Sequence, residues 1–466
     1  MEETWSWIDS IDDSETERVF WITGVAGAGK SAVAHTIAHQ CRLSQRHHSS
    51  CFFFDRGTDG RNNPDKLFST IVHDLASRSP DIHLHVGTVL ESNPTLASAP
   101  ISRQFEELLC GLKYEEEMPV VIVIDAVDEG RSSDLLQILR DGMQKLHKKF
   151  RIIITSRPVD SIVSNLSNVT HIRRKDIDIC DPDNLDDITL YSHHRLEHVA
   201  EVKRLKDWLN EKLMNAFIAK AEGLFIWVSV VASFLENISC PAKKLDNLLS
   251  KRSTSRFDPE IKMAELYKTV LEECNPGDED FIAGYQFFIG AIIAVKEPVS
   301  LDILDALHFC ETDLRAGEIL SSVASLLSSV DVDLPDRPIR LIHLSLREFL
   351  TSRDQGIPWF YLDPKYHNER LALLCQTVLT RDLLQSISDV TKHPALWYAC
   401  RFWIDHIVEV DDPHSKVIEA LQKFLTTKVM LWAKLMVSQR AFRKLSDSVQ
   451  VWIKVCTSGF CCPILA

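Results

Sequence analysis

The stretch VFWITGVAGAGKSAVAHTIA runs from Val19 to Ala38 and sets the architecture of what surrounds it. Its opening run, Val19 to Thr23, consists of β-branched and aromatic residues and stops at a glycine, which predicts a buried strand. The segment from Gly24 to Ser31 then matches G-x-x-x-x-G-K-[ST] at every fixed position. A helix-like pattern follows. We therefore predict a strand, a glycine-rich loop and a helix, in that order.

The loop in this pattern is suited to holding phosphate. Glycines let consecutive backbone N–H groups turn inward on a β-phosphate, and the first turn of the next helix adds unpaired donors and the positive end of its dipole. Lys30 is predicted to reach the β- and γ-phosphates, and the Ser31 hydroxyl to bind Mg²⁺. The predicted nucleotide-binding residues of this segment are Gly24, Gly27, Ala28, Gly29, Lys30, Ser31 and Ala32.

Length and composition limit the remaining possibilities. The chain has 466 residues, which exceeds a single core and suggests about three domains. Its formal net charge of −14 implies no general affinity for nucleic acid. The twelve cysteines form no CxxC pairs, which is typical of reduced, cytosolic thiols. The three adjacent or near-adjacent histidine pairs lack partners at ligand spacing, so we do not expect them to bind a metal.

The N-terminus and the apolar runs of the chain do not predict a membrane protein. The N-terminus is acidic and has no apolar core of a signal peptide. Leu224 to Leu235 and Phe281 to Val295 are apolar, but both are shorter than the roughly 18 to 20 residues that cross a bilayer. We expect both to be buried helices and the protein to be cytoplasmic.

A second motif, MPVVIVIDAVDEG, supplies the acids that a phosphate site needs. Val120 to Ile124 is a continuous apolar run, typical of a strand in a parallel sheet covered on both faces. Asp125 follows at its carboxyl end, where ligands bind in open α/β sheets, and is predicted to hold Mg²⁺. Asp128 and Glu129 are predicted to orient the attacking water, with Glu129 preferred.

Two further strands and two helices extend this pattern. Cys51 to Phe54 and Arg151 to Thr155 read as strands, while Leu67 to Ala76 and Ser133 to Lys149 read as helices. Strands that alternate with helices predict right-handed βαβ units and a parallel sheet. If the strand before Arg157 lay beside the loop strand, Arg157 could face the γ-phosphate; the alternative is an ordinary surface arginine.

These segments together resemble a known family. GVAGAGKSAVAHTIA, CFFFDRG, VVIVIDAVDEG and IIITSRP, followed by EGLFIWVSVVASFLE and RLIHLSLREFL, look like the NACHT type of STAND P-loop NTPases in the nephrocystin-like arrangement common in fungi. The resemblance covers roughly residues 5 to 360. It implies an α/β sheet with strand order 5-1-4-3-2, and it implies that Arg157 senses the γ-phosphate.

The resemblance also implies a domain plan. Residues 1–175 would be the NACHT P-loop NTPase domain, 176–276 an all-α helical domain, 277–356 a winged-helix domain, and 357–466 C-terminal helices with an irregular tail. Some relatives carry a Gly-x-Pro base contact where this chain has GLFIW, without proline. Relatives also carry effector and repeat domains. Because the loop begins at residue 24, we expect a switch module whose protein partners act through domains that it lacks.

Ile261 to Leu271, in the predicted helical domain, is amphipathic. Residues 281 to 352 read as helices followed by a hairpin, in which Val330 to Leu334 and Ile339 to Leu344 flank a proline-containing turn, and this arrangement suggests a winged helix. Ser345 and Glu348 match a capping box that opens the next helix. The helix in the recognition position, GEILSSVASLL, has no lysine or arginine, which argues against nucleic-acid binding.

His343 allows two interpretations. Its apolar neighbours alone indicate a histidine in the core whose ring nitrogens are hydrogen-bonded within the protein. By the resemblance, the matching histidine contacts the diphosphate of bound ADP and closes the inactive form.

The sequence therefore predicts a signal-transduction switch and a slow NTP hydrolase. It would be closed with ADP or GDP, and open and self-associating with ATP or GTP and Mg²⁺, in signalling of the fungal innate-immunity or incompatibility type. No Asn-Lys-x-Asp guanine signature occurs, and the choice between ATP and GTP stays open. The alternatives are an inactive nucleotide-binding scaffold or truncated decoy, and a P-loop phosphotransferase. Neither nucleic acid nor membrane is an expected partner.

Overall fold

The computed structural model describes residues 2–10, 17–44, 46–112, 114–130, 132–250, 258–274, 277–353, 358–383, 390–439 and 441. The irregular C-terminal tail predicted from the sequence lies outside these residues. The chain divides into two compact units. Unit 1 comprises Met1–Ala232 and Ala242–Pro259, and unit 2 comprises Ser233–Pro241 and Glu260–Ala466.

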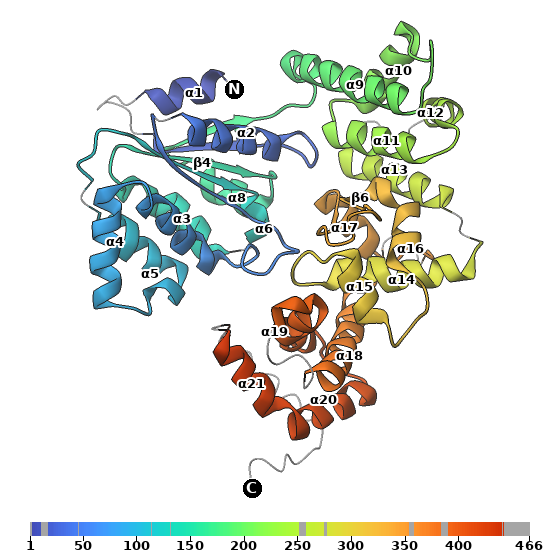
Figure 1. Cartoon of the computed structure of the whole chain (residues 1–466). Coiled ribbons are helices and arrows are strands. Elements are labelled where there is room, and N and C mark those ends of the chain that lie inside the picture. The colour runs from blue at the N-terminus through green and yellow to red at the C-terminus, as the bar shows by residue number, and fades with distance from the viewer. Residues whose placement is uncertain are drawn as a thin grey trace. The chain divides into compact units, whose positions relative to one another are not determined.

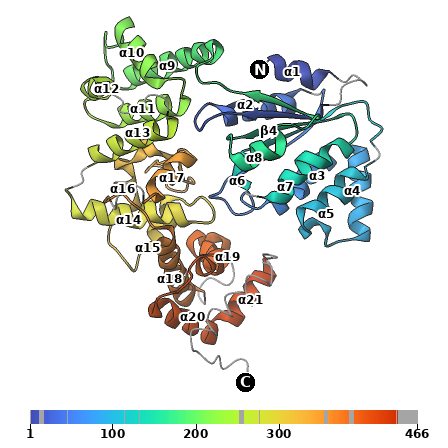
Figure 2. The same cartoon turned by 180° about the vertical axis from the view of Figure 1, so that it is seen from behind.

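Unit 1 is built on a five-stranded parallel sheet (Figures 1 and 2). The strand order is β2-β3-β4-β1-β5, which is the predicted order 5-1-4-3-2 counted from the other edge, so the predicted fold class is confirmed. Parallel pairing sets Thr23 beside Ser156, so β1 and β4 end at the same edge. The strands are β1 (Val19–Thr23), β2 (His48–Phe53), β3 (Val120–Asp125), β4 (Phe150–Ser156) and β5 (Ile172–Asp176).

The edge strand β5 has no counterpart among the strands predicted from the residues. Its sequence, IRRKD, is basic and mostly exposed, so it lacks the apolar run by which a central strand is recognised. It joins the sheet through backbone pairing to β1 and through stacking of Arg173 and Arg174 on Phe20 and Trp21. The sheet therefore depends at this edge on aromatic partners contributed by β1.

The alternation of side chains along the strands divides the core into two layers. Val19 and Trp21 face one layer with the helices that follow β2, while Phe20 and Ile22 face the other with Trp7 and Ile37. In Figure 1, α1 and α2 accordingly lie over one face of the sheet and α3, α4 and α5 over the other. The burial of both faces explains why the central strands are apolar without interruption.

The helices of unit 1 follow the predicted alternation with one correction. The predicted helix from Ser133 to Lys149 ends early: α7 is followed by a π-helical turn, Ile138–Gly142, and a 3₁₀ turn. The close approach of Phe105 to Gly142 accompanies this change, since a Cβ there would lie 2.7 Å from the Phe105 ring. The helices are α1 (Glu2–Asp9), α2 (Lys30–Leu43), α3 (Leu67–Ala76), α4 (Pro80–Ser92), α5 (Ile101–Phe105), α6 (Val127–Gly130), α7 (Ser133–Gln137), α8 (Asp160–Leu166), α9 (Pro182–Val202), α10 (Glu211–Ala221), α11 (Phe225–Asn237) and α12 (Pro241–Ser250), the last two crossing the unit boundary.

In its described residues, unit 2 is helical apart from one short antiparallel hairpin and an isolated antiparallel bridge between Val299 and Ile339. None of the helices in the described parts of the chain combines the length and apolar character that a membrane span requires. The helices and strands of unit 2 are α13 (Pro259–Glu273), α14 (Glu279–Ala294), α15 (Leu301–His308), α16 (Ala316–Ser322), β6 (Leu327–Ser328), β7 (Arg340–Leu341), α17 (Leu344–Thr351), α18 (Pro364–Asp382), α19 (Pro394–Val408), α20 (Ser415–Thr427) and α21 (Val429–Ser438).

The predicted hairpin is present but its first strand is misplaced. Val330 to Leu334 is not a strand; Leu327–Ser328 pairs with Arg340–Leu341 instead. The Asp331 carboxylate accepts the Asp333 N–H, and the Asp331 carbonyl accepts the Leu334 N–H. These local hydrogen bonds fold the segment into a turn, because aspartate side chains compete for backbone donors.

The predicted capping box at the start of α17 is also wrong. The residue that caps this helix is His343, whose Nδ1 accepts the Ser345 N–H at 3.1 Å. Ser345 therefore lies inside the first turn and is not the cap. The sequence pattern was ambiguous because serine is a strong N-cap former, whereas a capping histidine has no sequence signature.

Three histidines in the described part of unit 2 are buried in its core: His308, His367 and His406. His308 and His367 are each 1% exposed, and within the described residues His308 Nε2 and both ring nitrogens of His367 have no hydrogen-bond partner. Burial, and secondly the charge of Arg370, lowers the pKa of each of these two histidines to about 4. Arg370 itself is paired with Glu311 at 2.7 Å. His308 and His367 are therefore neutral at pH 7.

We expect unit 2 to lose stability in mild acid. In the unfolded chain these histidines take up protons below about pH 6.5, whereas in the fold they stay neutral to about pH 4. The unfolded state thus binds more protons in this range, and stability falls as pH falls, by up to roughly 3 kcal/mol for each histidine.

Urea unfolding at pH 7.5 and pH 5.0 measures this loss. The double variant His308→Asn with His367→Leu cannot take up these two protons, so its stability should change less between the two pH values; His406, whose pKa burial also lowers, remains in both proteins. An equal loss in the variant and the wild type would contradict the assignment.

Candidate functional site

The loop between β1 and α2 has the backbone geometry of a phosphate cradle. Gly27 has φ of 79° and Gly29 has φ of 90°, values that residues with a side chain rarely adopt. Gly29 is the residue before α2, and no side chain caps the first turn of this helix. The N–H groups of that turn are thus left for a ligand, in the position where helices bind anions.

Lys30 begins α2 and points back to the loop. Its Nζ donates to the carbonyl oxygens of Gly24 and Val25, both at 2.8 Å. Burial lowers the pKa of Lys30 to about 8, although the negative charge of Asp128 opposes this. A bound phosphate would favour the charged form further. Ser31 and Ala32 lie exposed in the same turn, beside the half-buried Lys30.

The start of α11 rests directly on this loop. The Phe225 N–H donates to the Gly27 carbonyl at 3.1 Å. A Cβ on Gly27 would lie 2.1 Å from Cγ2 of Ile226, so this position has room only for glycine. Asn184 of α9 holds the segment in place by donating to the carbonyls of Ile179 and Gly223. The apolar run from Leu224 to Leu235 predicts a buried helix here, but nothing in the sequence indicates its contact with the loop.

A cavity of about 960 Å³ adjoins the loop within unit 1. Phe225 and Tyr191 line it with their rings 5.7 Å apart, which offers an aromatic surface for a planar base. Aspartates from the end of β5 and the start of α9 make much of its polar lining. The cavity is lined by Ala28, Gly29, Ala32, Val33, Thr36, Lys175, Asp176, Ile177, Asp178, Asp181, Asp183, Asn184, Asp187, Leu190, Tyr191, His194 and Phe225.

Asp125 lies at the carboxyl end of β3, as predicted, and is 4% exposed. One of its carboxylate oxygens accepts the Thr155 hydroxyl at 2.5 Å, and Thr155 in turn accepts the Ala126 N–H at 2.9 Å. These bonds fix the orientation of the Asp125 carboxyl group, which interacts electrostatically with Lys30. Mg²⁺ in nucleotide sites needs only one or two such ligands beside the phosphates and water.

Asp128 and Arg157 form a partly buried ion pair. The Asp128 carboxylate accepts the Arg157 backbone N–H at 3.1 Å and lies 3.3 Å from Arg157 Nε. The side chains are 6% and 17% exposed, respectively. The pairing makes Asp128 a support for Arg157 in this structure. Whether Arg157 senses a γ-phosphate stays a prediction.

Glu129 is the acid whose proton affinity is most altered at this edge. Its carboxylate accepts the backbone N–H of Arg56, in the loop after β2, at 3.1 Å. Burial raises the pKa of Glu129 to about 7, although the Arg56 N–H opposes this rise. A carboxyl group with this pKa can accept a proton near neutral pH, as a residue that activates water must.

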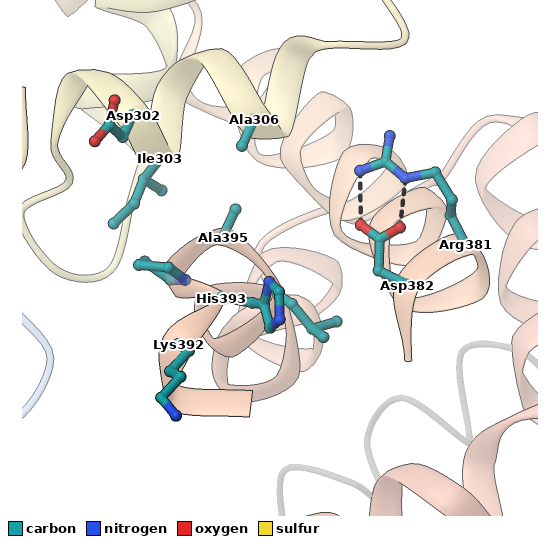
Figure 3. A pocket seen from close by; sticks show the side chains of 10 residues that line it. Asp302, Ile303, Ala306, Arg381, Asp382, Lys392, His393 and Ala395 are labelled. Carbon is teal, nitrogen blue, oxygen red and sulfur yellow. Dashed lines mark hydrogen bonds and ion pairs between the residues drawn. The ribbon is translucent and has the colours of Figure 1, made fainter. Parts of the chain in front are cut away.

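The remaining candidate residues and cavities lie elsewhere. His343 belongs to unit 2, where it caps α17. A second cavity, of about 420 Å³, lies between α15, α18 and α19 (Figure 3). Arg381 at its edge is paired with Asp382 at 2.6 and 2.7 Å, and none of the predicted site residues lines it. In the described parts of the chain, no three His, Cys, Asp or Glu side chains gather as metal ligands.

A glycine-rich loop with its lysine, an aspartate at the end of a neighbouring parallel strand and a five-stranded sheet together define a P-loop NTPase domain. Residues 1–157 match the family model "Nephrocystin 3, N-terminal". The chain is 23% identical over 470 residues to the vegetative incompatibility protein HET-E-1 of Podospora anserina, with 92% of this chain and 34% of that protein covered. It therefore spans about a third of the length of this curated relative.

Two solved structures resemble this chain only weakly. Drosophila ORC bound to DNA has a TM-score of 0.34 and 15% identity, covering 73% of this chain and 90% of that one. Drosophila ORC with poly(dA/dT) DNA and Cdc6 has a TM-score of 0.26 and 12% identity, covering 92% and 70%. At these TM-scores the likeness does not indicate a shared function. Residues 1–157 are similar to the nephrocystin 3 N-terminal family, and the chain is distantly similar to HET-E-1, as the sequence resemblance predicted.

The contact between Gly27 and Ile226 gives a matched pair of variants. Gly27→Ala adds a Cβ at positive φ and into Ile226, so it should displace the loop or α11 and weaken nucleotide binding at least about tenfold. Gly60→Ala has a similar φ of 80° but open space around it, and should cost only the backbone strain of about 1 kcal/mol.

Fluorescent-nucleotide titration and thermal unfolding of the two variants make the comparison. Truncating Ile226 to alanine in the Gly27→Ala background should restore part of the affinity. Equal behaviour of the two glycine variants would show that the contact with α11 is unimportant.

Proposed function

We propose that this chain is a nucleotide-operated signalling switch that binds ATP or GTP with Mg²⁺, hydrolyses it slowly, is closed with the diphosphate and self-associates with the triphosphate. The observation that carries the proposal is the gathering of the glycine loop, Lys30, Asp125 and Glu129 at one edge of the sheet, beside a cavity large enough for a nucleoside.

The roles of the residues follow from their chemistry. Lys30 would exchange its two carbonyl partners for phosphate oxygens, and Ser31 with Asp125 would hold Mg²⁺. Bound Mg²⁺ supplies neutralisation of charge on the β- and γ-phosphates. Glu129 orients the attacking water and accepts its proton. Asp128 keeps Arg157 in place until the γ-phosphate competes for it.

The switch is supported by the course of α11. The first residues of this helix, Phe225 and Ile226, touch the phosphate loop, while its last residues, from Ser233 onwards, belong to unit 2. A continuous helix transmits a displacement along its length. A triphosphate that shifts the loop would therefore act on unit 2 through α11, provided that it favours one conformation over the other.

The biological setting is inferred from the relative and from the cysteines. HET-E-1 is a vegetative incompatibility protein, and we propose fungal signalling of that type for this chain. The described cysteines are free, which suits the reducing cytoplasm. Protein partners would act through effector or repeat domains of the kind that relatives carry.

A scaffold that binds nucleotide without turnover is the second candidate. The ion pair between Asp128 and Arg157 favours it, because neither group can serve catalysis until the pair opens. Measured hydrolysis separates the two functions.

The pH dependence of hydrolysis tests the role of Glu129. Because Glu129 must be ionised to accept a proton and its pKa is about 7, the hydrolysis rate should rise through about pH 7 and level off above it. Glu129→Gln should keep Mg²⁺–nucleotide bound and lower the rate at least about a hundredfold. Asp125→Ala should instead weaken the Mg²⁺ dependence of binding. A wild-type hydrolysis rate in Glu129→Gln would contradict the assignment of Glu129 as the residue that activates water.

The role of His343 in closing the switch is tested by its alanine variant. If His343 contacts the diphosphate, His343→Ala should release ADP about ten times faster and shift the protein to larger species with ATP. Stopped-flow release of labelled ADP and light scattering behind a sizing column measure both effects. A variant that keeps ADP and stays monomeric would identify His343 as a structural residue only.

A further inference from the structure

The turn that carries Glu129 rests on the residues that follow β2. Phe54 donates its backbone N–H to the Asp125 carbonyl at 3.1 Å, which continues the pairing of β2 with β3 beyond the end of the strand. The Phe54 ring lies against Gly130, where a Cβ would come within 2.8 Å of a ring carbon. The last residue of α6 is therefore a glycine because the Phe54 ring occupies the space of a side chain.

Arg56 contacts the same turn through two groups. Its backbone N–H donates to one carboxylate oxygen of Glu129 at 3.1 Å, and its guanidinium donates to the Asp128 carbonyl at 3.3 Å. Among the described residues, no other protein donor reaches the Glu129 carboxylate. Because a carboxylate has two acceptor oxygens, this bond engages Oε2 and leaves Oε1 to accept from a water molecule.

The loop that contains Arg56 is fixed by its own hydrogen bonds. The Asp55 carboxylate accepts the Gly57 N–H at 2.9 Å and the Thr58 hydroxyl at 2.6 Å. The Asp55 N–H donates to the Arg61 carbonyl at 3.3 Å, which closes the loop. Aspartate side chains commonly fix turns in this way. The direction of the Arg56 N–H is thus set by the backbone of the loop.

The turn between β3 and α6 is held in a strained conformation. Ala126 has φ of 56°, a left-handed value that residues with a side chain rarely adopt. Its N–H donates to the Thr155 hydroxyl oxygen at 2.9 Å, and its carbonyl accepts the Glu129 N–H at 2.8 Å. Such strain persists only where the surrounding structure enforces it. Contacts from β4 on one side and from the residues after β2 on the other enforce the position of Glu129.

The charged groups around Glu129 make the effect of this N–H measurable. Burial is the largest influence and raises the pKa of Glu129 to about 7, with the charges of Asp128 and Asp55 adding to the rise. The Arg56 N–H is the largest opposing influence, and the charge of Arg56 opposes the rise as well. Lys30 also interacts with Glu129 electrostatically. Loss of the N–H alone should therefore raise the pKa of Glu129 further.

We propose that Arg56 is a positioning residue, whose backbone N–H fixes one carboxylate oxygen of Glu129 so that the other can accept a hydrogen bond from the attacking water. The loop from Asp55 to Thr58 keeps this N–H in place. The effect on hydrolysis rests on the proposed function, whereas the hold on the carboxylate does not. Because the backbone supplies the donor, the position tolerates residues other than arginine but excludes proline, which has no N–H.

A matched pair of variants isolates the N–H. Arg56→Ala and Arg56→Pro both lose the guanidinium, and only the proline variant also loses the N–H. The titration of Glu129 is followed by ¹³C NMR of the full chain labelled at the glutamate carboxyl carbon, without nucleotide, and Glu129→Gln assigns the resonance. The midpoint should lie about half a pH unit to one pH unit higher in Arg56→Pro than in Arg56→Ala.

A second pair reaches the same contact from the other side. The Cβ of Gly130→Ala would push α6 away from the Phe54 ring, so the midpoint of Glu129 should rise again. Gly87→Ala, on α4, adds a Cβ in open space and should leave titration and hydrolysis unchanged. Arg56→Pro and Gly130→Ala should each hydrolyse nucleotide at least about tenfold more slowly than their controls, with the pH profile displaced to higher pH.

Equal Glu129 midpoints in the two Arg56 variants would overturn the positioning role, and so would hydrolysis by Arg56→Pro at the rate of Arg56→Ala. If thermal unfolding shows that Arg56→Pro does not fold, the second pair decides, and a Gly130→Ala protein that titrates as Gly87→Ala does would overturn the role. If the midpoints move as expected but the wild type hydrolyses neither ATP nor GTP, the hold on Glu129 stands and the proposed hydrolysis fails.

Discussion

The parallel pairing of β3 with β4 and of β4 with β1 is the constraint on which the site depends. Strands that run in one direction end at one edge, so residues more than a hundred positions apart, Lys30 and Arg157, come to share an electrostatic environment. The two covered faces of the sheet supply the energy for this arrangement, since each buried aliphatic or aromatic side chain contributes about 1.5 to 3 kcal/mol. The polar edge is held by the apolar interior behind it.

The charged groups at this edge have polar partners within the protein. Lys30 donates to loop carbonyls, Asp128 is paired with Arg157, Asp125 is bonded to Thr155, and Glu129 accepts the Arg56 N–H. A polyanion that entered would alter several of these pairings together. In the proposed switch, the site would respond to the number of phosphates, because each additional negative charge would compete for a partner that is already engaged. The proposed switch requires this property of its nucleotide site.

Much of this could be predicted from the sequence where a signal is local. The loop motif and the apolar runs of β1, β3 and β4 gave the sheet, and the family resemblance gave its order. The basic edge strand β5 could not be recognised, because its place comes from pairing with β1 and from the rings of Phe20 and Trp21. The contact of Ile226 with Gly27 joins segments some 200 residues apart, and neither segment has a sequence pattern that indicates it. At α17 the serine pattern was misleading, since the Ser345 hydroxyl bonds to its neighbour His343 and to Tyr267 of α13.

The central claim is that the loop of unit 1 binds nucleoside phosphates through Lys30. Calorimetric titration of the full chain with ATP, GTP and their diphosphates, with Mg²⁺, tests it directly. The wild type should bind at least one triphosphate, and Lys30→Ala should weaken it by about ten- to a hundredfold, because a charge-assisted contact is lost. Lys66→Ala removes an exposed lysine far from the loop in sequence and should bind as the wild type does. A folded Lys30→Ala protein with wild-type affinity would contradict the account.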